Sequence, residues 1–212
     1  VAVTTVGVEN GQSVTITLNG ATYTGSVSSN SASVTISASG LQALTDGSSY
    51  TLTADVSDAA GNAATQLTSS AFTVDKSAPS INAIATSALS WGAVLNATED
   101  NSAGTVTVTT VGVEDGQTLT ITLNGDTYTG SVSSNSVTVT ITAAGLQALT
   151  DGQSYTMTAD VSDAAGNAAT QLTSSAFTVD KSAPSINAIA TSALSWGAVL
   201  NATEDNSAGT VT

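Results

Sequence analysis

The side chains best suited to chemistry in this chain are the oxygen-bearing ones of two segments, DVSDAAGN at 160–167 and VDKSAP at 179–184. They are Asp160, Asp163, Asn167 and Asp180. Carboxylate and amide oxygens in a flexible loop that contains glycine are the ligands that a hard cation such as Ca²⁺ prefers. The same residue types are also common in solvated turns for conformational reasons alone. The segments by themselves therefore leave both a calcium loop and a plain turn open.

Both segments occur a second time, at 55–62 and 74–79, because most of the chain is duplicated. Residues 1–107 superpose on 106–212 with eleven differences and a constant offset of 105. A period of this length is that of a whole domain, not of a solenoid turn or a propeller blade. The sequence therefore predicts a tandem array of domains.

The composition excludes several classes of protein and site. Among 212 residues there are 16 acids and two lysines, with no arginine, histidine or cysteine, so that the net charge is −14. Such a chain is repelled by nucleic acid and by anionic membrane surfaces. Because histidine and cysteine are missing, disulfides and zinc sites are excluded. There is no apolar run long enough to span a membrane, and we recognise no signal peptide.

Alternating hydrophobic residues predict short strands throughout the repeat. Residues 14–18 alternate valine, isoleucine and leucine with threonine, which is typical of a half-buried strand. The pair Asn19-Gly20 that follows is a strong hairpin signal. Only GLQALTDG, 40–47, suggests a helical turn, and the absence of longer helical periodicity argues against a βαβ unit. About seven short strands separated by turns predict an all-β fold, an immunoglobulin-like β-sandwich with Greek-key connections.

The linker Lys-Ser-Ala-Pro, 76–79, sets the register of the domains. If Pro79 opens a domain, 77–180 is a complete immunoglobulin-like repeat. Residues 1–76 are then a repeat that lacks its opening strands, and 181–212 are the opening strands of the next repeat. The predicted partners are therefore adjacent repeats of the same chain, head to tail. We also hypothesise that the last segment completes the first fragment of a neighbouring molecule.

The stretch LTDGQSYTMTADVSDAAGN, 149–167, together with FTVDKSAP, 177–184, resembles the bacterial immunoglobulin-like extender repeats of giant repeats-in-toxin (RTX) adhesins, similar to those of the Marinomonas ice-binding adhesin. The resemblance covers the whole chain. It implies a long stalk of stacked repeats, rigidified by Ca²⁺, that projects a distal adhesive domain and does not itself bind the target. The chain departs from the family at Lys76 and Lys181, where a small polar residue is commoner.

The resemblance also implies Ca²⁺ ligands at equivalent positions of the copies. In the complete repeat they are Asp160, Asp163, Asn167 and Asp180. In the preceding copy they are Asp55, Asp58, Asn62 and Asp75. The loop 96–104 and its second copy add Asn96, Glu99 and Asp100, with Asn201, Glu204 and Asp205.

One ion is expected to bridge two domains if Asp75 ends one of them while Glu99 and Asp100 lie at the same pole of the next. Such an ion would immobilise the linker. Three further acids, Glu114, Asp115 and Asp151, lie in hairpin-like turns. They are weaker candidate ligands, because acids in such turns are more often solvated turn residues.

An enzyme is not expected, because the carboxylates lie in open loops without a histidine, a cysteine or an apolar pocket to shift their pKa values. No small-molecule substrate is predicted. A Lys–Asn isopeptide would have to use the one lysine of each repeat, which lies in the linker rather than between core strands. The open alternative is an immunoglobulin-like binding module that recognises carbohydrate or a host protein through its loops. Trp91 and Trp196, the aromatic platforms for such a site, lie in apolar surroundings that favour the core.

The resemblance therefore implies a structural extender of a bacterial cell-surface adhesin, extracellular and active in cell adhesion and biofilm formation. Near-identical copies suit a spacer better than a receptor site. In this hypothesis acidic poles repel one another until Ca²⁺ neutralises them. Extracellular modules bind this ion at roughly 10⁻⁴–10⁻³ M, so that it would fill the sites outside the cell and not in the cytosol.

Overall fold

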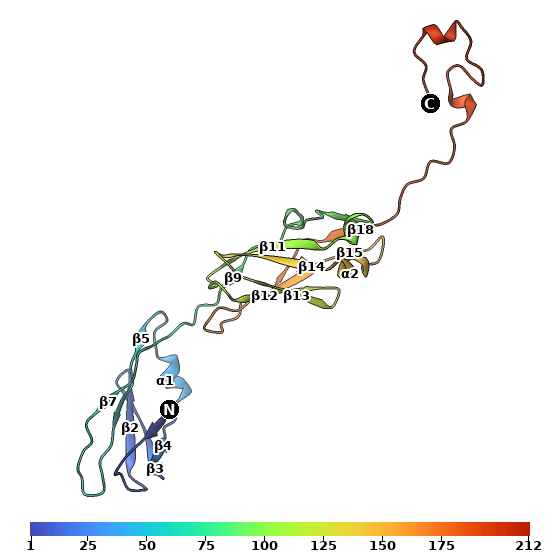
Figure 1. Cartoon of the computed structure of the whole chain (residues 1–212). Helices are drawn as coiled ribbons and strands as arrows, with labels where there is room; N and C mark the ends of the chain where they lie inside the picture. The colour runs from blue at the N-terminus through green and yellow to red at the C-terminus, as the bar shows by residue number, and fades with distance from the viewer.

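The structure, a computed structural model, describes residues 1–212 and consists almost entirely of short strands and turns. Figure 1 shows two β-rich bodies joined by an extended linker, and a second extended stretch that leads to a small C-terminal segment. The predicted all-β fold is confirmed. None of the helices has the length and apolar character needed to cross a membrane.

The first body is formed by residues 1–76. Its elements are β1 (Ala2–Thr4), β2 (Ser13–Leu18), β3 (Ala21–Ser28), β4 (Ser31–Ser33), α1 (Ala38–Gln42), β5 (Ser49–Tyr50), β6 (Thr53–Asp55), β7 (Leu67–Thr68) and β8 (Phe72–Thr73). They form a sheet in the order β1-β4-β3-β2-β6-β7 and a small sheet of β5 and β8. The β2–β3 hairpin turns where it was predicted, because Asn19 and Gly20 take φ values of 49° and 78°.

The second body is formed by residues 77–180. Its elements are β9 (Ser80–Ile81), η1 (Thr86–Ala88), β10 (Val94–Asn96), η2 (Glu99–Asn101), β11 (Gly104–Val111), β12 (Thr118–Leu123), β13 (Asp126–Ser131), β14 (Ser136–Ile141), α2 (Ala143–Gln147), β15 (Ser154–Tyr155), β16 (Met157–Asp160), β17 (Leu172–Thr173) and β18 (Phe177–Asp180). Three sheets result, in the orders β14-β11-β9, β13-β12-β16-β17 and β10-β18-β15. The predicted helical turn exists in both bodies, but it begins two residues earlier than expected, because Ser37 and Thr142 cap it at its start.

Packing differs sharply between the two bodies. The second has a core cluster of 21 buried residues, whereas the first has a cluster of five. Segment 77–107 accounts for part of the difference, because its Trp91 packs edge-on against Phe177 at 5.4 Å between ring centroids. Phe177 is 1% exposed, whereas its copy in the first body, Phe72, is 37% exposed.

Beyond Lys181 and Ser182, the rest of the segment 181–212 lies apart from both bodies and contains η3 (Thr191–Ala193) and η4 (Glu204–Asn206). The strands expected here do not form a β-ladder, and the single β-bridge between Leu194 and Val211 is the one strand-like pairing in this segment. The physical reason is that the copies of these strands in the second body, β10 and β11, pair mainly with β18 and β14. Those partner strands belong to the body of a repeat, which this segment does not contain.

Candidate functional site

Asp75 lies at the end of the first body, just before the linker, and Asn167 of the second body faces it. The Asn167 Nδ2 lies 3.3 Å from the Asp75 carbonyl oxygen and 3.4 Å from Asp75 Oδ1. A shallow cavity beside this contact is lined by Asp46 and Asp75 from the first body and by Glu114 and Ala164 from the second. The copy of VDKSAP in one repeat therefore meets DVSDAAGN of the following repeat.

The loop that faces the joint, 163–167, is closed by its own hydrogen bonds. Asp163, which is 4% exposed, accepts from the Asn167 backbone N–H at 2.7 Å and from Asn167 Nδ2 at 2.8 Å. Gly166, at φ 94°, lets the backbone close the turn. Burial raises the pKa of Asp163, but the hydrogen bonds from Asn167 outweigh it and hold the pKa below its usual value. The joint therefore contains a fixed, ionised carboxylate.

Three oxygens from the two bodies converge on the amide nitrogen of Asn167. They are the Asp163 Oδ2, the Asp75 Oδ1 and the Asp75 carbonyl oxygen. Asp75 retains further lone pairs, because the other hydrogen bond that its side chain accepts is from Ser77 N at 3.0 Å. Carboxylate and carbonyl oxygens around one point are the donor set of a calcium site.

The carboxylates of the chain are nevertheless spaced widely. Nowhere do three acidic side chains stand close enough together to hold a metal ion. The donor types at the joint therefore fit Ca²⁺, whereas their spacing is wider than a bound ion requires.

Glu114, one of the turn acids, lines the cavity at the joint. Its Oε2 accepts from the Ala164 N–H at 2.8 Å, so the turn that carries it packs against loop 163–167. The copy Glu9 makes the same contact with Ala59 at 2.9 Å. The Glu114 side chain is exposed, as expected of a turn acid, and its contact with Ala164 lies within the second body.

The loop 96–104 lies at the other end of the second body, where the chain leaves it. β10 and β18 pair in parallel, with Asn96 opposite Asp180. Asn96, Glu99 and Asp180 line a shallow cavity at this pole. The expectation that Glu99 and Asp100 meet the linker aspartate of the preceding domain is therefore wrong, because β11 carries the chain from this loop to the opposite end, where β9 pairs with it. The acidic loop meets the linker aspartate of its own repeat instead.

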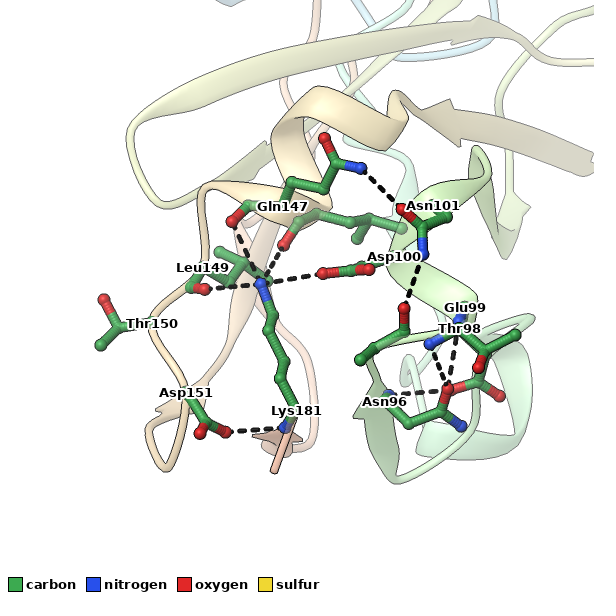
Figure 2. Close-up of polar contacts among 12 residues, drawn as sticks. Asn96, Thr98, Glu99, Asp100, Asn101, Gln147, Leu149, Thr150, Asp151 and Lys181 are labelled. Atoms are coloured by element: carbon green, nitrogen blue, oxygen red, sulfur yellow. Dashed lines mark hydrogen bonds and ion pairs between the residues drawn. The ribbon is translucent and has the colours of Figure 1, made fainter. Parts of the chain in front are cut away.

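Asp100 lies against the ammonium group of Lys181, with Oδ2 and Nζ 3.0 Å apart (Figure 2). The same Nζ donates to the carbonyl oxygens of Leu149 and Gln147, at 2.9 Å and 3.1 Å. Asp151 accepts from the Lys181 N–H at 2.7 Å and from the Ser182 hydroxyl at 2.7 Å. Asp151 therefore binds the linker, and it remains exposed, as expected of a turn acid.

The remaining predicted ligands have protein partners or face solvent. Asp160 accepts from Gln171 Nε2 with both oxygens at 2.9 Å, and Asp55 is held by Gln66 in the same way. The loop of Asp58 and Asn62 repeats the hydrogen bonds of 163–167, but it is exposed. In the C-terminal segment, Glu204 accepts from the Asn201 N–H at 3.0 Å and Asp205 is exposed. Asp115, the third turn acid, accepts from the Ser134 N–H at 2.6 Å.

Three solved structures of similar sequence are adhesin fragments. A Ca²⁺-stabilised adhesin of an Antarctic bacterium that binds ice is 32% identical over 86% of this chain and 44% of its own, with a TM-score of 0.49. A fragment of a bacterial ice-binding adhesin is 31% identical over 82% of this chain and 55% of its own, with a TM-score of 0.45. An immunoglobulin-like domain of the M. primoryensis ice-binding adhesin is 31% identical over 48% of this chain and 95% of its own, with a TM-score of 0.34. The chain spans about half the length of the first two structures.

Among curated proteins, none matches the chain. A bacterial family matches it over residues 40–178, which is more than half of its length. That family is described as the bacterial Ig-like domain, group 3. The match agrees with the all-β architecture and confirms the resemblance to bacterial immunoglobulin-like repeats. The chain belongs to the bacterial Ig-like domain (group 3) family.

Proposed function

We propose that this chain is a structural extender from the stalk of a bacterial surface adhesin, and that it works outside the cell by holding a distal adhesive domain at a distance. In this proposal 77–180 is one complete repeat, 1–76 is the body of the repeat before it, and 181–212 opens the repeat after it. A non-catalytic role suits the site, because its carboxylates line shallow surface cavities rather than an enclosed pocket.

The observation that carries the proposal is the joint itself. Asp75 of one repeat and Asn167 of the next are within hydrogen-bonding distance, and Glu114 lies beside them on the cavity wall. Since the linker and the loop are the same in each copy, every successive joint can repeat these contacts. A spacer needs such a reproducible joint, whereas a receptor site does not.

Calcium is proposed as the cation of this joint. Asp75 and Asp163 bring carboxylates from two domains toward one point, and their mutual repulsion favours an open joint without a counter-ion. When bound, Ca²⁺ supplies positive charge and oxygen coordination there. Asp75, Asp163 and Glu114 are the acids that would hold it, and an adhesin similar in sequence is itself Ca²⁺-stabilised.

The test measures rotational diffusion of the two bodies by amide ¹⁵N relaxation, on the whole chain, with chelator and with millimolar Ca²⁺. Two independently tumbling bodies should become one elongated particle when Ca²⁺ is added. At a free concentration 100-fold above its dissociation constant, a bound ion adds about 2.7 kcal/mol to the joint. If the joint is equally mobile with chelator and with Ca²⁺, the proposed role of calcium is wrong.

The duplication supplies matched controls for that test. Asp163→Asn should abolish the calcium response at the joint, whereas Asp58→Asn alters the equivalent residue in the first body, whose loop faces no other domain. Asp75→Asn and Asp180→Asn form a second such pair. If the control variants abolish the response as well, the ion that orders the chain is not at the joint.

A further inference from the structure

The chain has only two cationic side chains, and both lie at the same place in the repeat. Lys76 and Lys181 follow the last strand of their bodies, and the ammonium group of each turns back onto the end of a short helix. A chain of net charge −14 thus uses its entire positive charge to hold its two linkers. This repeated placement indicates a specific role for the lysine.

At Lys181 the ammonium group is surrounded by four oxygens (Figure 2). Three are main-chain carbonyls at the end of α2 and in the turn after it, those of Leu146, Gln147 and Leu149, at 3.4, 3.1 and 2.9 Å. The fourth is Asp100 Oδ2 at 3.0 Å, in the one ion pair of the structure. The carbonyls at the C-terminal end of a helix carry partial negative charge and lack partners within the helix. This arrangement is an oxygen cage around a cation.

Asp100 requires such a cation. The residue is 7% exposed, and a carboxylate removed from water is unfavourable unless it is paired and hydrogen-bonded. Lys181 is the one positive charge near it, and the two side chains are 19% and 9% exposed, so the pair is shielded from solvent. The ion pair is therefore not a loose surface contact.

We propose that the ammonium group of Lys181 takes the place of a metal ion at this end of the second body. There it neutralises Asp100 and attaches the linker to α2. Because the Lys181 N–H and the Ser182 hydroxyl also bind Asp151, the first two linker residues are held by both main chain and side chain. The linker then leaves the domain in a fixed direction whether or not Ca²⁺ is bound. Lys181 is a positioning residue in this role.

Lys76 is a natural comparison within the same chain. Its Nζ makes the equivalent contacts with Leu41, Gln42 and Leu44, at 3.5, 3.0 and 2.6 Å. No carboxylate completes its cage, since the structure has no other ion pair. The Lys76 ammonium group is therefore bound by carbonyl oxygens alone, whereas that of Lys181 is bound by carbonyl oxygens and by a buried carboxylate.

The inference deepens the proposed stalk role, and its readout is separate from the calcium joint. The experiment measures ¹⁵N heteronuclear NOEs of the 181–182 amides and thermal unfolding of the whole chain, in chelator. We expect these amides to be as ordered as those of β18 without Ca²⁺. Lys181→Met should make them mobile and lower the melting temperature of the second body by roughly 5–10 °C. If Ca²⁺ proves to have no effect at the Asp75 joint, the results expected here for Lys181 do not change.

The control is Lys76→Met, which should affect the first body less because no buried charge is left unpaired. Lys181→Met combined with Asp100→Asn should cost no more than Lys181→Met alone, since the two residues act as a pair. Linker amides that order only when Ca²⁺ is added, or equal effects of the two lysine variants, would overturn the proposal. An intact mass smaller by one water would also overturn it, because the pair would then be an amide bond rather than an ion pair.

Discussion

At the scale of single residues, acids in turns hold the linker through hydrogen bonds. Asp151 accepts from the Lys181 N–H and the Ser182 hydroxyl, and these two contacts, in that order, lower its pKa from the usual value. Asp46 does the same in the first body, where the Ser77 hydroxyl and then the Lys76 N–H lower its pKa. Each of these carboxylates is thus more acidic in the folded chain than in the unfolded one.

This shift predicts a stability that depends on pH. A carboxylate with a lowered folded pKa stabilises the fold above its unfolded pKa, about 3.9, and this stabilisation is lost as the pH falls through the folded value. Asp151→Asn should therefore lower the melting temperature at pH 7 by a few degrees. The melting temperature of this variant should also fall less steeply than that of the parent chain as the pH is lowered. Thermal unfolding from pH 7 to pH 2 measures both effects.

Asp126→Asn is the matched control for this prediction. Asp126 is exposed, and alanine stands at the equivalent position of the first copy, so the variant should leave the pH profile unchanged. An acid transition that is equally steep in Asp151→Asn and in the parent chain would show that other carboxylates cause it.

At the scale of elements, segment 77–107 contributes five of the buried residues of the second core. Its Trp91 is 5% exposed, and Gly104 lies so close to the indole that any side chain there would collide with it. The equivalent Trp196, in the C-terminal segment, is half-buried and has no aromatic partner. The core position expected for Trp91 is therefore confirmed, and the same residue type serves a different packing role in each copy.

The two tryptophans give a paired prediction. Trp91→Ala should destabilise the second body by about 3–5 kcal/mol, because it removes a large buried side chain and leaves a cavity. Trp196→Ala should change this stability little, since that side chain is not part of a core. Denaturant unfolding of the second body, followed by far-UV circular dichroism and amide NMR, measures both. Equal losses would mean that segment 77–107 does not complete the second core.

At the scale of the whole molecule, the chain is an elongated series of units rather than one globule (Figure 1). Residues 182–212 repeat the sequence 77–107, whose Leu95 is fully buried against the second body. The copy Leu200 is 52% exposed. The first body, whose Phe72 is partly exposed, has nearly the sequence of the body that buries Leu95. The two ends of the chain therefore carry complementary surfaces.

These surfaces predict head-to-tail association of the 212-residue chain. Its mass, measured by size-exclusion chromatography with light scattering, should rise with concentration. Leu200→Asp should prevent the rise by placing a charge in the contact. Val199→Asp should not, because the equivalent Val94 remains 48% exposed even in the complete domain. A constant monomer mass at every concentration would contradict the prediction.

The sequence by itself determined the class of the fold and the duplication. Alternating apolar residues specify a strand by its period, and an Asn-Gly pair specifies its turn by backbone conformation, so both are local properties. The segments that meet at the joint were also identifiable, because their residue types are those of cation ligands. The predicted set of ligands, however, included Asp160, which Gln171 holds, and Asp100, which Lys181 holds.

Only the tertiary structure decided which acids lie together. Glu114 and Asp151 carry no local signal that separates them from solvated turn residues, because their partners are 50 and 30 residues away along the chain. The end of the domain at which the loop 96–104 lies also has no local signal, because it depends on the direction in which β11 crosses the domain. Contacts of this kind arise from how strands pair and which end of a sheet each loop reaches, and no local sequence pattern encodes that arrangement.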